Sequence, residues 1–200
     1  TLALHAAEAS FVLVKNSGIL PLPETITSVY VIGPTASNPQ ALYGNYYGLN
    51  GRMVTFLEGL IEELPEGVRI DYRPGTLLER EKPNPIEWAL GESEQADVTI
   101  ACFGLDNSLE GEEGDAVASE EKGDRTFIEL PSSQIEYLHR LRRRCKKLVV
   151  VLSTGSALAI PEIHTIADAI LIAWYPGEEG GTALARTLFG KHNPSGALPV

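Results

Sequence analysis

Five short apolar segments recur along the chain and alternate with segments of helical pattern. Most of them are continuous runs of Val, Ile and Leu, as expected for strands whose sheet is covered by helices on both faces. Strands that alternate with helices form β-α-β units with right-handed crossovers and a mainly parallel sheet. The predicted strands are residues 29–32, 68–72, 98–103, 148–152 and 169–174.

The segments between these runs have the spacing of amphipathic helices. The clearest has apolar residues at i, i+3 and i+4 over 53–64, which predicts a helix that packs on the sheet. Pro131 suits a first helical position, and a helix is expected from there to Cys145. Further helices are expected at 2–14, at about 84–95 and at 182–189. The predicted fold is an α/β three-layer sandwich, with 68–72 near an edge of the sheet because it alternates polar and apolar residues.

The charge of the chain argues against nucleic acid and anionic membrane surfaces as partners. Sixteen basic residues stand against 27 acidic ones, and the resulting net charge of −11 repels phosphate. The basic residues between Arg140 and Lys147 are expected at a helix end, where they complement the helix dipole. No run approaches the ~20 apolar residues of a membrane span.

Neither a metal nor a cofactor is expected. The two cysteines, Cys102 and Cys145, suggest no disulfide framework or metal site, and the histidines lack the spacing of zinc ligands. No G-x-G-x-x-G motif follows a strand, and there is no G-x-S-x-G elbow.

Chemistry is expected in four loops, because functional groups in open α/β sheets gather at the carboxyl ends of the strands. These loops are 33–51, 104–124, 153–156 and 175–181. The second is long and has eight acidic side chains against one lysine between Asp106 and Asp124. Long ordered loops are more often functional than short ones. The third could present backbone N–H groups to an anion.

Glu110 in the long loop is the candidate for proton donation to a leaving group, if burial or neighbouring carboxylates raise its pKa. From composition alone, a solvated acidic loop without chemistry is an equal alternative. Calcium binding is a third, although the Asp-x-Asp-x-Asp-Gly spacing is absent. The three tyrosines at residues 43–48 could stack on a sugar or simply pack their loop, and packing is the simpler interpretation.

A series of short motifs resembles, almost end to end, the C-terminal α/β-sandwich domain of family three glycoside hydrolases, the exo-acting β-glucosidases and β-xylosidases. Each motif alone is unspecific, but their order is specific. They are VKNSGILPL at 14–22, VIGP at 31–34, YGNYYG at 43–48, GL at 104–105 with LEGE at 109–112, GDR at 123–125 followed by LP at 130–131 and Gln134, WYPG at 174–177 with GG at 180–181, and NPSG at 193–196 with LP at 198–199.

The resemblance implies a sheet of six strands, one of them antiparallel, so the count of five is one short. It also implies retaining hydrolysis of terminal β-linked xylose or glucose, in oligosaccharides or aryl glycosides. An aspartate of a separate barrel domain attacks the anomeric carbon, and a glutamate of this domain protonates the departing oxygen. Glu110 falls on the position of that glutamate, and Glu112 is its nearest competitor. Asn107 and Tyr47 are expected to contact the substrate.

Further expectations concern the loop ends and the domain organisation. Asp124 and Arg125 are expected to anchor the return of the long loop as a charge-assisted pair. Ala197 stands where many members carry a basic residue. No segment resembles the barrel domain, so the chain is expected to be a single C-terminal domain, 1–200, that is inactive without the barrel of the same polypeptide.

Two rival interpretations remain. One is a carbohydrate-binding module, in which the aromatic and acidic loops grip a sugar without cutting it. The other is a catalytically dead scaffold domain. The amino-acid sequence of residues 104–110 is slightly closer to that of xylosidase-like members than to that of glucosidases.

Overall fold

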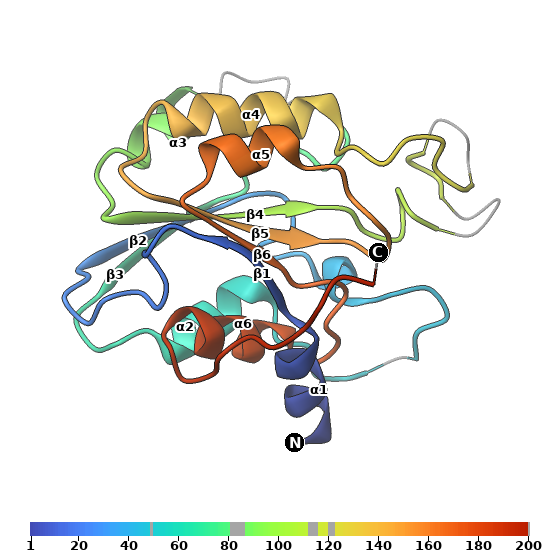
Figure 1. The fold of residues 1–200 in the computed structure, drawn as a ribbon, viewed down its shortest axis with the longest axis horizontal. Coiled ribbons are helices and arrows are strands. Elements are labelled where there is room, and N and C mark those ends of the chain that lie inside the picture. The colour runs from blue at the N-terminus through green and yellow to red at the C-terminus, as the bar shows by residue number, and fades with distance from the viewer. Residues whose placement is uncertain (49, 81–86, 112–115, 120–122, 200) are drawn as a thin grey trace.

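The computed structural model describes residues 1–48, 50–80, 87–111, 116–119 and 123–199. In these residues the protein is a three-layer sandwich, with a six-stranded sheet between two layers of helices (Figure 1). The predicted fold class is confirmed. The strands are β1 (Val12–Asn16), β2 (Ser28–Ile32), β3 (Arg69–Arg73), β4 (Val98–Gly104), β5 (Leu148–Ser153) and β6 (Ala169–Ile172).

The strand order is β1-β6-β5-β4-β2-β3. Strands β2 to β6 are parallel, and β1 runs antiparallel to β6. The continuous apolar runs of β4 and β5 are buried along their whole length, because helices cover both faces. Strand β3 is at an edge, as its polar alternation predicted, and exposes Arg69 and Asp71.

The N-terminal segment differs from its prediction. The helix expected over 2–14 ends earlier, as α1 (Leu2–Ser10), and the chain then becomes extended at Phe11 and enters β1. Val12 and Val14 are β-branched, which disfavours helix and suits a strand that pairs with β6. The count of five strands was therefore wrong, and the six strands implied by the resemblance are confirmed.

Helices α1, α2 (Phe56–Glu63) and α6 (Gly180–Leu188) cover one face of the sheet, and α3 (Glu87–Glu92), α4 (Ser132–Arg142) and α5 (Pro161–Ile166) cover the other (Figure 1). The short α5 was not predicted. Each face has its own apolar core: along β4, Ile100 and Cys102 belong to one and Ala101 and Phe103 to the other. No helix in the described ranges is long and apolar enough to cross a membrane.

Close approach of two glycines joins α2 to α6. A Cβ atom on Gly59 would lie 2.0 Å from the backbone of Gly181, and one on Gly181 would lie 1.9 Å from the carbonyl oxygen of Thr55. No side chain fits at either position. Gly181 of the Gly-Gly motif at 180–181 is therefore explained by helix packing.

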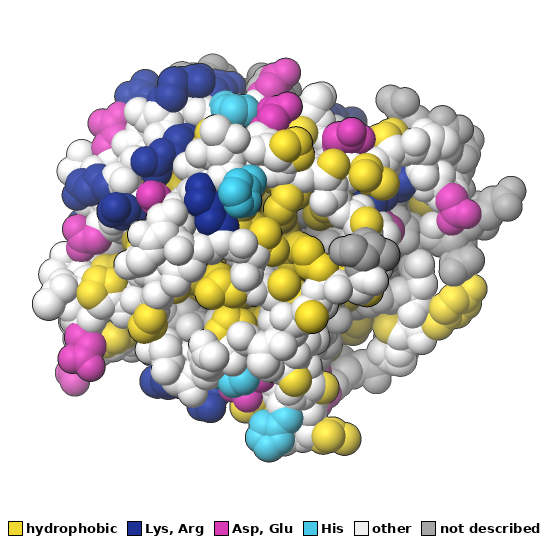
Figure 2. Space-filling model, viewed as in Figure 1, with side chains coloured by type: hydrophobic (Ala, Val, Ile, Leu, Met, Phe, Trp, Pro, Cys, Tyr) yellow, Lys and Arg dark blue, Asp and Glu magenta, His cyan; other side chains and the backbone are white. Residues whose placement is uncertain are grey.

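The basic cluster is at the end of α4, as expected. Figure 2 shows Lys and Arg side chains gathered in that part of the surface. Arg142 donates to Asp168 at 2.9 Å, and Arg144 donates to Glu94 at 2.6 Å. These contacts support the interpretation of a solvated helix end.

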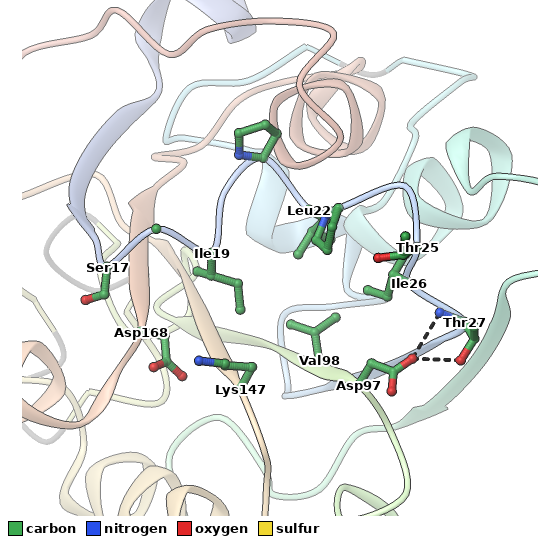
Figure 3. A pocket seen from close by; sticks show the side chains of 13 residues that line it. Ser17, Ile19, Leu22, Thr25, Ile26, Thr27, Asp97, Val98, Lys147 and Asp168 are labelled. Carbon is green, nitrogen blue, oxygen red and sulfur yellow. Dashed lines mark hydrogen bonds between the residues drawn. The ribbon is translucent and has the colours of Figure 1, made fainter.

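Asp97 ties the amino ends of β2 and β4 together. Its Oδ2 accepts hydrogen bonds from the Thr27 hydroxyl at 2.8 Å, the Thr27 amide at 3.0 Å and the Ser28 amide at 3.1 Å (Figure 3). These bonds, led by that from the Thr27 hydroxyl, lower the pKa of Asp97 from 3.8 to about 2, and partial burial opposes them.

We predict that Asp97→Asn lowers the free energy of unfolding at pH 7 by about 1 kcal/mol, a small value because the side chain is 41% exposed. Because the folded pKa is depressed, the contribution of Asp97 is present above pH 4 and is lost as the pH falls towards 2. Urea titrations at pH 7, 4, 3 and 2 should show the difference shrinking. The control Asp71→Asn, on the exposed edge, should change stability by less than about 0.5 kcal/mol. A constant difference for Asp97→Asn down to pH 2 would contradict this account.

Candidate active site

Four loops from the carboxyl ends of the strands meet at Glu110. From the loop after β2, Asn45 donates its side-chain amide to the Glu110 carbonyl at 3.2 Å. From the loop after β5, the backbone N–H of Gly155 donates to Glu110 Oε2 at 2.7 Å. After β6, the Tyr175 hydroxyl donates to the same oxygen at 2.5 Å. The four loops in which chemistry was expected therefore meet at one residue, and those after β5 and β6 contact its carboxylate.

The second carboxylate oxygen of Glu110, Oε1, has two further donors. Ser156 Oγ donates to it, and Arg125 Nη2 lies 3.5 Å away. Arg125 Nη2 also donates to Ser156 Oγ at 2.6 Å and to the Ala157 carbonyl at 3.3 Å. The side chains of Glu110 and Arg125 are only 12% and 9% exposed. An ionised carboxylate can accept from all of these donors at once.

Tyr175 acts as a hydrogen-bond donor to this carboxylate. Burial, followed by the negative charge of Glu110, raises the pKa of Tyr175 well above its ordinary value of 10. Tyr175 therefore keeps its proton throughout the neutral range.

The start of the long loop is held where β4 ends. Gly104 has a φ of +129°, and a Cβ there would lie 2.1 Å from the Ser153 carbonyl oxygen, so only glycine fits. The buried side chain of Gln134 accepts from the Gly104 N–H at 2.9 Å and donates to its carbonyl at 2.7 Å. This clamp explains Gln134 of the motif and fixes the origin of the loop.

A single turn of the backbone, from Asp106 to Glu110, then positions Glu110. Its backbone N–H donates to the carbonyl of Asp106 at 3.0 Å. The Asp106 carboxylate is buried and accepts from the Ser108 N–H at 2.9 Å and from Asn38 at 3.0 Å. The acidic side chain of Asp106 is thus occupied in holding the turn.

Glu110 lines an open hollow of about 310 Å³. Arg125 and Ser156 also line it, and Phe127 and Ile128, which are both exposed, contribute apolar surface. A larger hollow, of about 580 Å³, lies at the opposite end of the parallel strands, beside their amino ends. Asp97, Lys147 and Asp168 line it (Figure 3). None of the donors to Glu110 lines that larger hollow. The smaller hollow is therefore the candidate active site.

The other predicted residues have different surroundings. Asn107 is half-buried in the turn that leads to Glu110. Tyr47 stacks on Tyr43, with ring centroids 4.3 Å apart, and is 47% exposed, which favours loop packing for one face of its ring. Glu112 lies outside the described residues. Contact of Asn107 and Tyr47 with substrate stays a prediction.

Arg125 anchors the return of the long loop, but its ion-pair partner is Glu110 and not the exposed Asp124. Sequence reasoning did not single out Tyr175 or Ser156 as partners of Glu110. Their signal was positional, since both follow the carboxyl end of a strand. Residues 153–156 could present backbone N–H groups to an anion, and the Gly155 N–H donates here to the carboxylate of Glu110 itself. Within the described ranges, no group of three or more His, Cys, Asp or Glu side chains could hold a metal ion.

We predict that Arg125→Gln lowers the free energy of unfolding by about 2–3 kcal/mol, because it leaves a nearly buried carboxylate with one cation fewer. The matched control is Arg69→Gln, which removes an exposed pair with Asp71 at 2.9 Å and should cost less than about 0.5 kcal/mol. Urea denaturation of both variants measures the difference. Equal losses would show that the Arg125–Glu110 contact adds no more than a surface pair.

Comparison with known proteins identifies the family. Residues 11–200 match the family model described as "Glycosyl hydrolase family 3 C-terminal domain". The chain is 34% identical over 199 residues to the exo-1,4-beta-xylosidase xlnD of Emericella nidulans, covering 98% of this chain and 23% of that protein. It is 33% identical over 221 residues to the periplasmic beta-glucosidase of Salmonella typhimurium, covering 99% of this chain and 28% of that protein.

The fold agrees with these matches. A solved structure of the GH3 exo-beta-xylosidase XlnD, in complex with a xylobiose aziridine activity-based probe, superimposes with a TM-score of 0.84 at 33% identity. The superposition covers 98% of this chain and 24% of the xylosidase chain. This chain thus spans about a quarter of the length of the relatives it matches. It belongs to the C-terminal domain family of family 3 glycosyl hydrolases, whose members here include β-xylosidases and β-glucosidases.

Proposed function

We propose that this chain is the acid/base-bearing domain of a retaining exo-β-glycosidase, and that Glu110 is the general acid/base. The observation that carries the proposal is that four loops meet at one residue, Glu110, whose hydrogen-bonded carboxylate lines an open hollow. The substrate class is a terminal β-linked xylose or glucose residue, because the relatives are named as β-xylosidases and β-glucosidases. The amino-acid sequence of residues 104–110 favours xylose over glucose as the terminal sugar.

The mechanism needs two carboxyl groups about 5–5.5 Å apart. In the first step a carboxylate attacks the anomeric carbon, and Glu110, as the acid, gives its proton to the departing glycosidic oxygen. In the second step Glu110, now ionised, takes a proton from the water that hydrolyses the glycosyl-enzyme. We assign the attacking carboxylate to a barrel domain of the same polypeptide, in keeping with the family resemblance.

The apolar surface beside the site supports a neighbouring domain there. Of the nine large apolar side chains exposed in the described residues, five belong to the loop after β2 or to the segment between β4 and α4, which contains Glu110. Exposed apolar surface around a polar site is typical of an interface. We propose that this face packs against the barrel. The five are Tyr46, Tyr47, Val117, Phe127 and Ile128.

We predict that Glu110→Gln, in the full-length polypeptide, lowers kcat for xylobiose or cellobiose by about 10²–10⁴-fold. The reason is that an unactivated sugar leaves only with a proton. An aryl glycoside with a good leaving group should lose much less in the glycosylation step, because it departs without full protonation. The control is Glu94→Gln, which alters an exposed pair with Arg144 and should keep full activity.

Full turnover of the disaccharide by Glu110→Gln would remove Glu110 from this role. The stereochemical part of the proposal is tested separately, by ¹H NMR of the sugar released first. A β-anomer supports retention, and an α-anomer contradicts it.

The rival function, a carbohydrate-binding module, makes a different prediction for this chain alone. A site completed by a barrel domain should bind xylobiose or cellobiose weakly when the barrel is absent, and we expect no saturation below about 10 mM. Isothermal titration of the 200-residue chain measures this. Saturation at micromolar sugar would favour the binding module, and loss of that binding in Tyr47→Ala would assign it to the aromatic loop.

A further inference from the structure

The donors around Glu110 differ in one chemical property. The backbone N–H of Gly155 and the guanidinium of Arg125 can only donate hydrogen bonds, whereas the hydroxyls of Ser156 and Tyr175 can donate or accept. In the proposed reaction Glu110 alternates between an ionised and a protonated state. The ionised state can accept from all four groups. A protonated carboxyl must direct its own proton at an acceptor, and among these four groups only a hydroxyl can become one.

Of the two hydroxyls, that of Ser156 is constrained. Its oxygen already accepts a hydrogen bond from Arg125 at 2.6 Å while its proton is donated to Glu110, so one of its two lone pairs is occupied. The hydroxyl of Tyr175 has Glu110 Oε2 as its partner among the described residues. Tyr175 is therefore better placed to reverse its hydrogen bond when Glu110 gains a proton.

The backbone holds Tyr175 firmly at this position. Trp174 has a φ of +58°, a left-handed conformation that is strained for a bulky residue. The indole N–H of Trp174 donates to the Ser10 carbonyl at 2.9 Å, which keeps this residue in place. On either side of these residues the backbone is hydrogen-bonded. The Ala173 N–H donates to the Leu152 carbonyl and the Gly177 N–H donates to the Leu42 carbonyl, both at 2.9 Å.

The ring of Tyr175 lies close to two glycines, Gly155 and Gly44. A Cβ on Gly155 would lie 2.8 Å from Tyr175 Cε2, and a Cβ on Gly44 would lie 3.8 Å from Cδ2. A larger residue at 155 would therefore displace the ring from Glu110. The loops after β2 and β5 thus leave a space that the tyrosine ring fills.

We infer that Tyr175 is a positioning residue for Glu110: its hydroxyl holds Oε2 and helps to set the pH at which Glu110 carries its proton. The inference rests on the proposed function of Glu110. In the ionised state Tyr175 donates to Oε2. In the protonated state the Tyr175 hydroxyl turns and its oxygen accepts from the carboxyl. When substrate is bound, the carboxyl proton turns from Tyr175 to the glycosidic oxygen and is transferred to it.

The test is Tyr175→Phe in the full-length polypeptide. Removal of the hydroxyl takes a donor from the ionised form, so the alkaline limb of the pH–kcat/KM profile should move to higher pH, by about one unit. For the unactivated disaccharide, kcat should fall about ten-fold with little change in KM, the loss expected for one hydrogen bond to a charged group. An aryl glycoside with a good leaving group should lose less in its glycosylation step.

The matched control is Tyr30→Phe. It removes another hydroxyl with a buried hydrogen bond, to the Ala89 carbonyl at 2.8 Å, but does not touch Glu110. It should alter stability without moving the alkaline limb. A purely structural role of Tyr175 would lower kcat for both substrates alike and leave the limb in place, and that result would overturn the inference.

A second measurement needs no variant. In the wild-type 200-residue chain, the ¹³Cζ resonance of Tyr175 should shift with the same midpoint as the ¹³Cδ resonance of Glu110. If the ¹³Cζ chemical shift of Tyr175 stays constant while Glu110 titrates, the inference is overturned, even if Tyr175→Phe fails to fold.

The two proposals fail separately. If Glu110→Gln keeps full activity, the proposed function fails, and with it the catalytic part of the inference, whatever Tyr175→Phe does. If Glu110→Gln loses activity but Tyr175→Phe keeps both the wild-type kcat and the wild-type limb, only the inference about Tyr175 fails.

Discussion

A nearly buried carboxylate needs a full set of hydrogen bonds, and this requirement ties the functional end of the domain together. Glu110 meets it with donors from the loops after β5 and β6 and with Arg125 at the return of its own loop. Leaving any of these groups unpaired would cost free energy. The loops are therefore mutually dependent, and a change in one is expected to disturb the others.

The parallel sheet makes such a cluster possible. The carboxyl ends of parallel strands lie on the same side of the sheet. The loops after β2, β4, β5 and β6 therefore start side by side, although they are distant in the chain. Glycine at the strand ends allows the loops to approach closely, as at Gly104 against Ser153. The larger hollow lies at the amino ends of the strands, where the hydrogen bonds of Asp97 join β2 to β4. The contacts at that end stabilise the fold, and we propose the chemistry at the other end.

Much of the fold could be predicted from local pattern. Continuous apolar runs identified β4 and β5, because a strand covered on both faces must be apolar on both, and alternation placed β3 at an edge. Strand β1 could not be identified in this way. Its apolar residues directly follow an Ala-rich helix and fit the same helical stripe, so pairing with β6 was needed to separate the two elements.

For the candidate site, local sequence was enough to select the acidic loop, since charge, length and position after a strand are all visible along the chain. The family resemblance proposed Glu110 within it. It was not enough to find the groups that contact Glu110. Ser156 and Tyr175 are 46 and 65 residues from it, and Arg125 was expected to pair with its neighbour Asp124. Hydrogen bonds between distant loops depend on the order and register of the strands beneath them. Those are properties of the packed sheet, and no short stretch of residues contains them.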